Sequence, residues 1–104
     1  MNVKFLVDSG ASYTLLPYQV WRTLGLKSME VIRCELADGT EVERRLSECL
    51  LELDHRQRHT PVILGEKDDT ALLGAITLEE FGLVLNPFTR ELQPMRMMLA
   101  RTSE

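Results

Sequence analysis

The chain has 104 residues, which suits one domain, and 44% of them are hydrophobic, which supports a packed core and excludes a disordered chain. The formal net charge of −4 excludes a nucleic-acid surface built on bulk positive charge. Cys34 and Cys49 are too few for a disulfide framework, and no apolar run approaches the roughly 18 residues of a membrane span. We therefore expect a single domain over residues 1–104 in a reducing, cytoplasmic setting. Both thiols should be free and buried, with neither membrane nor nucleic acid as a partner.

The first part of the chain predicts a strand, a turn and a short helix. Val3–Val7 is typical of a short buried strand, and the small and polar residues 8–12 predict a turn after it. The stretch 17–24 begins with a proline and carries an apolar face, and Gly25 fits a C-terminal cap. We expect a helix there, with Trp21 in the core.

The middle of the chain predicts a hairpin followed by another strand. Apolar and polar residues alternate between residues 30 and 53, which indicates strands exposed on one face. The Asp38–Gly39 pair interrupts this alternation and is a strong hairpin signal. The polar residues 54–59 predict a second turn, and residues 61–64 predict the next strand.

The last third combines short apolar stretches with one more helix. Thr77 stands three residues before Glu80, which fits a capping box, and Gly82 would stop a helix that starts there. The remaining expectations are a charged loop over 66–69 and short strands over 71–74, 83–85 and 91–99. At least six short strands with two short helices, and no regular βαβ alternation, predict a mostly antiparallel all-β fold. We expect a small closed or partly open barrel.

The segment with the clearest chemical content surrounds Asp8. An apolar strand delivers this acid into a tight turn made with Ser9 and Gly10, and residues this small let other backbone approach the carboxylate closely. Alone, Asp-Ser-Gly is equally typical of an ordinary Asx turn after a strand, and most Asp-Gly hairpins are only turns.

Taken in order, these segments resemble the retropepsin-like aspartic peptidases. The catalytic-strand motif of that family is similar to residues 6–11, Leu-Val-Asp-Ser-Gly-Ala. Further along, its helix, its flap hairpin and its late hydrophobic-hydrophobic-Gly motif are similar to residues 14–26, 37–40 and 72–74. Order and spacing agree over residues 5–92, so the four signals together are far more specific than the first one alone.

The resemblance implies an aspartic endopeptidase with an acid-protease barrel and a flap, acting on extended polypeptide without a metal or other cofactor. It implies that Asp8 is catalytic and that the flap closes over the substrate. The family's chemistry uses two facing carboxylates, and this chain carries one Asp-Ser-Gly, which implies a homodimer. The residues implied to support the catalytic loop are Ser9, Gly10 and Ala11, and those implied to form the flap are Ala37, Asp38 and Gly39.

Two departures from the family pattern leave the expected fold unchanged but weaken the expectation of strong activity, whereas Asp8, Ser9 and Gly10 argue for catalysis. Only seven residues precede Asp8, so the N-terminal strand of the relatives is expected to be shortened here, and residues 91–99 would supply much of the dimer contact. Ala75 stands where retroviral members place a bracing arginine. The alternative is a weak or inactive module used for dimerisation or peptide binding. His55 and His59 are expected in a solvated loop, and Met95, Met97 and Met98 in interface packing.

Overall fold

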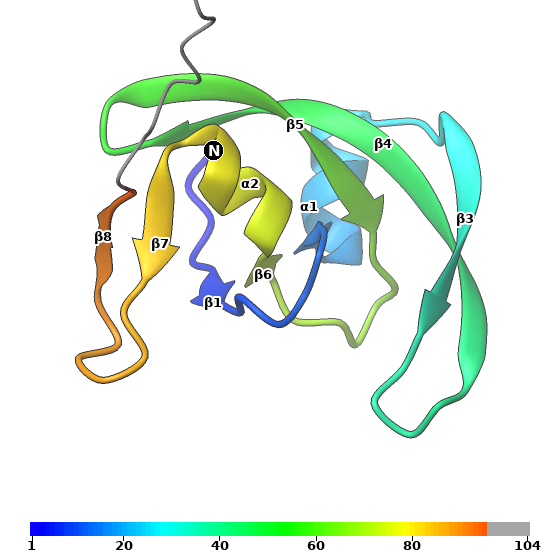
Figure 1. Cartoon of the computed structure of the whole chain (residues 1–104). Helices are drawn as coiled ribbons and strands as arrows, with labels where there is room; N and C mark the ends of the chain where they lie inside the picture. The colour runs from blue at the N-terminus through cyan, green and yellow to red at the C-terminus, as the bar shows by residue number, and fades with distance from the viewer. Residues whose placement is uncertain (96–104) are drawn as a thin grey trace, which may run out of the picture.

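The computed structural model describes residues 1–95, so Met97, Met98 and the end of the strand predicted over 91–99 lie outside the described residues. The elements in chain order are β1 (Leu6–Val7), β2 (Thr14–Leu16), α1 (Tyr18–Leu24), β3 (Glu30–Glu35), β4 (Glu41–Leu53), β5 (Arg56–Leu64), β6 (Leu72–Leu73), α2 (Ala75–Glu80), β7 (Leu83–Leu85) and β8 (Leu92–Pro94) (Figure 1).

Most strands belong to one open six-stranded sheet with the order β1-β6-β2-β5-β4-β3. The pairs β3–β4 and β4–β5 are antiparallel, whereas β1–β6 and β2–β5 are parallel. The strands β7 and β8 form a separate antiparallel pair. The prediction of a mostly β fold with two short helices is confirmed. The strand β6 lies between β1 and β2, parallel to β1 and antiparallel to β2, which places a late segment of the chain against the Asp8 strand.

The β4–β5 hairpin is the longest feature of the fold and corrects one prediction. The predicted turn over 54–59 is wrong, because the turn contains only Asp54 and His55, with φ of 54° and 65°. Residues 56–59 instead begin β5 and pair with β4. These residues are polar because they are exposed in a projecting hairpin, and not because they form a loop. His59 therefore lies in a strand, and both histidines are exposed.

The first helix is as predicted, apart from its first residue. Pro17 is the N-cap and α1 starts one residue later, whereas Gly25 adopts φ 73° and forms the C-cap. Trp21 is buried, and its Nε1–H donates to the Gly65 carbonyl oxygen at 2.7 Å. The helix is thereby tied to the end of β5.

The second helix starts earlier than the capping-box prediction placed it. Its N-cap is Gly74, and it contains Thr77 in its interior, so the prediction of Thr77 as the cap is wrong. The Thr77 side chain is fully buried and forms hydrogen bonds with other hydroxyls. The glycine at position 82 does follow the helix end, with φ 66°.

The core consists of two clusters that Phe5 and Cys49 join. The first cluster packs α1 against the sheet, and its buried members are Leu16, Trp21, Val62 and Leu64. The second cluster packs α2 against the sheet, and its buried members are Leu51, Leu73, Leu78 and Phe81. Cys34 and Cys49 are free, as predicted, but they are half-buried and not buried. Burial, with a smaller contribution from Glu48, raises the pKa of the Cys49 thiol.

The predicted buried strand Val3–Val7 is mostly absent. Only Leu6 and Val7 pair with β6, and the Leu6 side chain is 59% exposed. Within residues 1–95, neither helix has the length and apolar content needed to cross a membrane.

Candidate active site

Asp8 lies where β1 ends, in a turn at one edge of the molecule (Figure 1). Main-chain bonds to β6 fix this position: the Leu6 N–H donates to the Ala71 carbonyl at 2.9 Å, and the Asp8 N–H donates to the Leu73 carbonyl at 3.0 Å. The Asp8 side chain is half-buried. The carboxylate is therefore positioned by a paired strand and still reaches the surface.

The turn after Asp8 closes on the carboxylate itself. The Gly10 N–H donates to Asp8 Oδ1 at 3.0 Å, and the Ala11 N–H donates to the Asp8 carbonyl at 3.1 Å. A Cβ on Gly10 would lie 3.3 Å from Asp8 Oδ1, which explains the small residue in contact with the acid. Ser9 and Gly10 are exposed beside the carboxylate, and Ala11 is half-buried.

The second half of the loop is held by the start of α2. The Ala75 N–H donates to the Ala11 carbonyl at 2.8 Å, and the Ile76 N–H donates to the Ser12 carbonyl at 3.0 Å. Ala75 thus contacts the loop through its main chain. Gly74 packs so tightly that a Cβ there would lie 2.4 Å from the Tyr13 carbonyl carbon and oxygen.

The close packing at Gly74 predicts a large loss of stability in a Gly74→Ala variant. The added methyl group would overlap rigid backbone, so the loop or the start of α2 must shift, at a cost of about 3 kcal/mol in the free energy of unfolding. Urea denaturation measures this cost. Gly25→Ala is a useful comparison, because its Cβ meets nothing within 4 Å and only its positive φ opposes the change. A Gly74→Ala variant no less stable than Gly25→Ala would contradict the packing argument.

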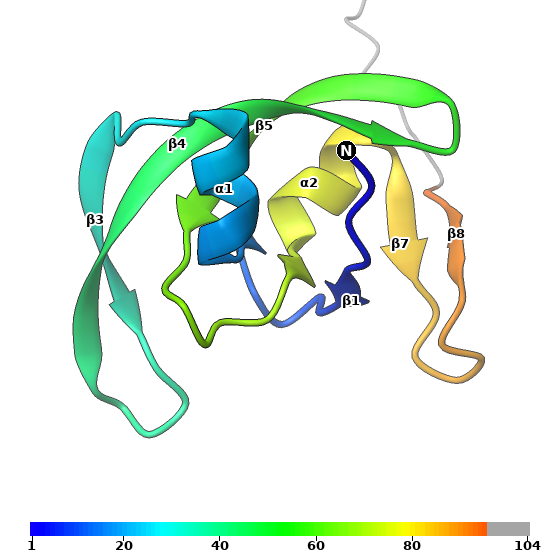
Figure 2. The ribbon, with the colours of Figure 1, turned by 180° about the vertical axis from the view of Figure 1, so that it is seen from behind.

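The predicted flap is the hairpin between β3 and β4. The Leu36 N–H donates to the Thr40 carbonyl at 2.7 Å, and Gly39 adopts φ 86°. Side-chain and main-chain hydrogen bonds from Thr40 lower the pKa of Asp38, so this exposed carboxylate keeps its partner until the pH falls below its ordinary pKa. Figure 2 shows that the hairpin tip and the Asp8 turn extend toward the same edge of the molecule.

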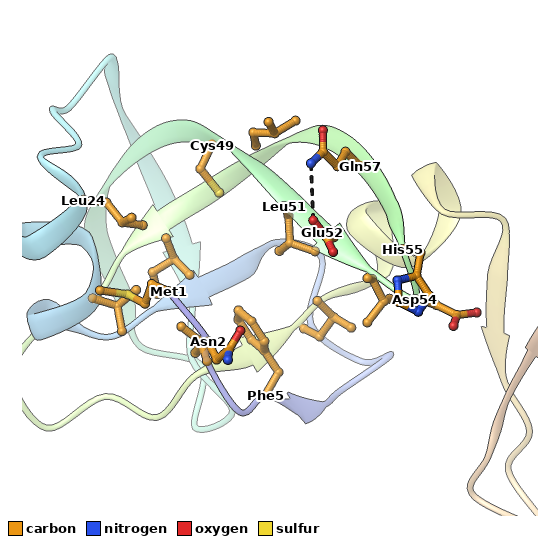
Figure 3. A pocket seen from close by; sticks show the side chains of 16 residues that line it. Met1, Asn2, Phe5, Leu24, Cys49, Leu51, Glu52, Asp54, His55 and Gln57 are labelled. Carbon is orange, nitrogen blue, oxygen red and sulfur yellow. Dashed lines mark hydrogen bonds between the residues drawn. The ribbon is translucent and has the colours of Figure 1, made fainter.

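A hollow on the described part of the chain does not contain Asp8. It has a volume of about 640 Å³ and lies between the N-terminal residues, α1 and the far end of the β4–β5 hairpin (Figure 3). Phe5, Leu24 and Leu51 line it, together with the exposed Asp54 and His55 at one end. This hollow is therefore distinct from the surface on which the predicted site residues lie.

The sequence prediction placed Asp8, its loop and the flap tip in one region, and it missed the groups that support the loop. Among residues 1–95, no three His, Cys, Asp or Glu side chains gather as a metal site. The groups that were missed are hydroxyls: Thr14, Thr60 and Thr77 are each at most 1% exposed, and Thr14 Oγ1 accepts the Gly74 N–H at 3.0 Å. The one signal in the sequence that could have identified these residues is that each is a threonine at a position where the hydrophobic pattern of its strand or helix requires an apolar side chain.

One family model matches most of the chain. The model of the family described as "gag-polyprotein putative aspartyl protease" matches residues 1–80. The chain belongs to this aspartyl protease family. The match covers the Asp8 loop, the β3–β4 hairpin predicted to be the flap, and both helices. No curated protein matches the chain.

Proposed function

We propose that the chain is one half of an aspartic endopeptidase, in which a water molecule is activated between two Asp8 carboxylates from a homodimer. The observation that supports this most directly is the Asp8 turn. A carboxylate at a strand end, with Oδ1 bonded to the Gly10 N–H and its own N–H bonded to Leu73, is a positioned and accessible acid. It occurs in a chain that belongs to an aspartyl protease family.

The need for two chains follows from the number of suitable acids. Peptide hydrolysis by this chemistry uses one carboxylate as the base and another as the acid. The sequence contains a single Asp-Ser-Gly, and Asp38 lies in the flap hairpin. A two-fold axis beside Ser9 would bring two copies of Asp8 together, as in any isologous interface. The strand β1 is an edge of the sheet, so this side of the turn is open to a partner.

The paired carboxylates would share the chemical work. Two carboxylates in close contact cannot both ionise without a large cost, so the pair holds one proton. The ionised partner takes a proton from the water as it attacks the peptide carbonyl carbon, and the protonated partner gives its proton to the carbonyl oxygen. The tip formed by Ala37, Asp38 and Gly39 would close over the peptide and exclude bulk water.

The surface beside Asp8 supports an apolar substrate. Side chains alternate along a strand, so Leu6 faces the same side as Asp8, two residues later. Leu6 pairs in register with the half-buried Leu72 of β6, and Leu6 itself is 59% exposed. Two leucines next to the acid favour a peptide with apolar side chains around the bond that is cleaved. Extended peptides bind such sites by adding main-chain pairing.

The test is cleavage of two matched peptides, one with leucine and one with glutamate on both sides of the central bond. We expect cleavage of the leucine peptide, with a bell-shaped dependence of kcat/KM on pH in the acid to neutral range, because the pair must hold one proton. A chelator should have no effect. Activity that rises continuously above pH 8, or that the chelator removes, would point to another mechanism. A dimer that binds the peptide without cleaving it would support the inactive-module alternative.

A further inference from the structure

A row of buried hydroxyls connects the surface of α2 to the backbone beside Asp8. The Gly74 N–H lies 3.0 Å from Thr14 Oγ1, and Thr14 Oγ1 lies 2.6 Å from Thr77 Oγ1. Thr77 Oγ1 lies 2.7 Å from Thr60 Oγ1, which in turn lies 2.7 Å from Glu80 Oε1. The three threonines are buried, whereas Glu80 is exposed. Four hydrogen bonds therefore lead from solvent to the Gly74 amide.

The direction of every bond in this row follows from Glu80. An ionised carboxylate can only accept, so Thr60 donates its single hydroxyl proton to Glu80. The contact between Thr60 and Thr77 must then use the proton of Thr77, and the next contact must use the proton of Thr14. With its proton used in this way, the Thr14 oxygen can only accept a hydrogen bond from any further partner.

The other end of the row agrees with this direction independently. Gly74 offers a main-chain N–H, which can only donate, and it donates to Thr14 Oγ1. Each hydroxyl thus donates once and accepts once, and the described residues contain no buried side-chain N or O atom without a partner. Aligned bonds of this kind strengthen one another, and a charged acceptor strengthens them further.

The row ends on the peptide group that holds Asp8. The Leu73 carbonyl, which accepts the Asp8 N–H at 3.0 Å, belongs to the same planar peptide unit as the Gly74 N–H. A bond that fixes the N–H of this unit also fixes its C=O. When the N–H donates to a polarised row, the carbonyl becomes a better acceptor for the Asp8 amide.

We propose that Glu80 is a positioning residue for Asp8, acting through Thr60, Thr77, Thr14 and the Leu73–Gly74 peptide group. The proposal rests on the proposed function only where Asp8 is taken to be catalytic, because the positioning itself is a property of the folded chain. Glu80 lies outside the Asp8 turn and the predicted flap, and the sequence marks it only as the glutamate of a capping box that does not form, because the N-cap of α2 is Gly74. Its role is to supply the acceptor that gives the row its direction.

Glu80→Leu removes the acceptor, Glu80→Gln keeps an acceptor oxygen without the charge, and Glu79→Leu is the matched control on the exposed neighbouring residue. Amide hydrogen exchange, followed by NMR, reports the positioning without reference to activity. Glu80→Leu should speed exchange of the Gly74 and Asp8 amides about tenfold, roughly the effect of losing one charge-assisted hydrogen bond. Glu80→Gln should have a smaller effect, and Glu79→Leu none. Equal exchange rates in Glu80→Leu and Glu79→Leu would overturn the proposal.

Peptide cleavage separates this inference from the proposed function. With an active enzyme, Glu80→Leu should lower kcat with little change in KM, because Asp8 moves while the peptide-binding surface stays, and Glu80→Gln should recover most of the loss. If the unmodified chain cleaves nothing, the proposed function fails, and the exchange rates still decide the positioning role. If Glu80→Leu speeds exchange but leaves kcat unchanged in an active enzyme, Glu80 does not position Asp8 for catalysis.

Discussion

Replacement of Asp8 by asparagine is expected to abolish peptide cleavage in a protein that still folds. The amide has nearly the shape of the carboxylate, and its oxygen can still accept the Gly10 N–H, so the turn should be kept. An amide cannot take a proton from water or carry the proton that the carboxylate pair shares. The loss of kcat/KM should therefore be at least about a thousandfold. Cleavage kinetics together with thermal unfolding measure both parts of this expectation.

The control for Asp8→Asn is the same substitution at Asp54, in the turn of the β4–β5 hairpin. Asp54 is exposed and adopts φ 54°, a conformation that asparagine tolerates well, so Asp54→Asn should change neither stability nor activity. Asp8→Asn that keeps more than a few per cent of the unmodified rate in a pure preparation would show that Asp8 is not the catalytic acid. A large loss in both variants would instead indicate a general effect of the substitution.

The parts of the fold that the sequence predicted correctly depend on local signals. The helix over 17–24 has a proline at its start and Gly25 after its end, and both act through fixed backbone angles that need no tertiary context. The Asp38–Gly39 hairpin is equally local, because Gly39 supplies the positive φ. The Asp8 turn is local in the same way, because Gly10 contacts the carboxylate of Asp8, which is only two residues away.

The errors in the prediction concern residues whose role is set by distant parts of the chain. Thr77 resembles an N-cap in sequence, but Thr14 and Thr60 bind its hydroxyl inside the fold, and α2 begins earlier at Ala75. The strand β2 was not predicted, because three residues become a strand only when β5 and β6 pair with them. Polar residues at buried positions can be interpreted only once their partners are known.

Activity is expected to need two chains, and mixing of active and inactive chains tests this most sharply. If each site uses one Asp8 from each of two subunits, a heterodimer of unmodified and Asp8→Asn chains carries one carboxylate and is inactive. At chain concentrations above the dissociation constant of the dimer, with free exchange of subunits and a ninefold excess of the inactive chain, only about one tenth of the unmodified chains find an active partner. The activity per unmodified chain should therefore fall roughly tenfold. The same excess of Asp54→Asn chains should cause no fall, because those chains supply an intact Asp8.

Dilution provides the second test of the two-chain site. Below the dissociation constant of the dimer, the dimer concentration falls with the square of the chain concentration, so a tenfold dilution should lower the specific activity about tenfold. Light scattering at the assay concentration identifies the species present. The sheet edge β1 is only two residues long, so few main-chain bonds are available to a partner there, and we expect dissociation within an accessible concentration range. A monomer that cleaves peptides at a constant specific activity, unaffected by excess Asp8→Asn chains, would exclude a site built from two copies of Asp8.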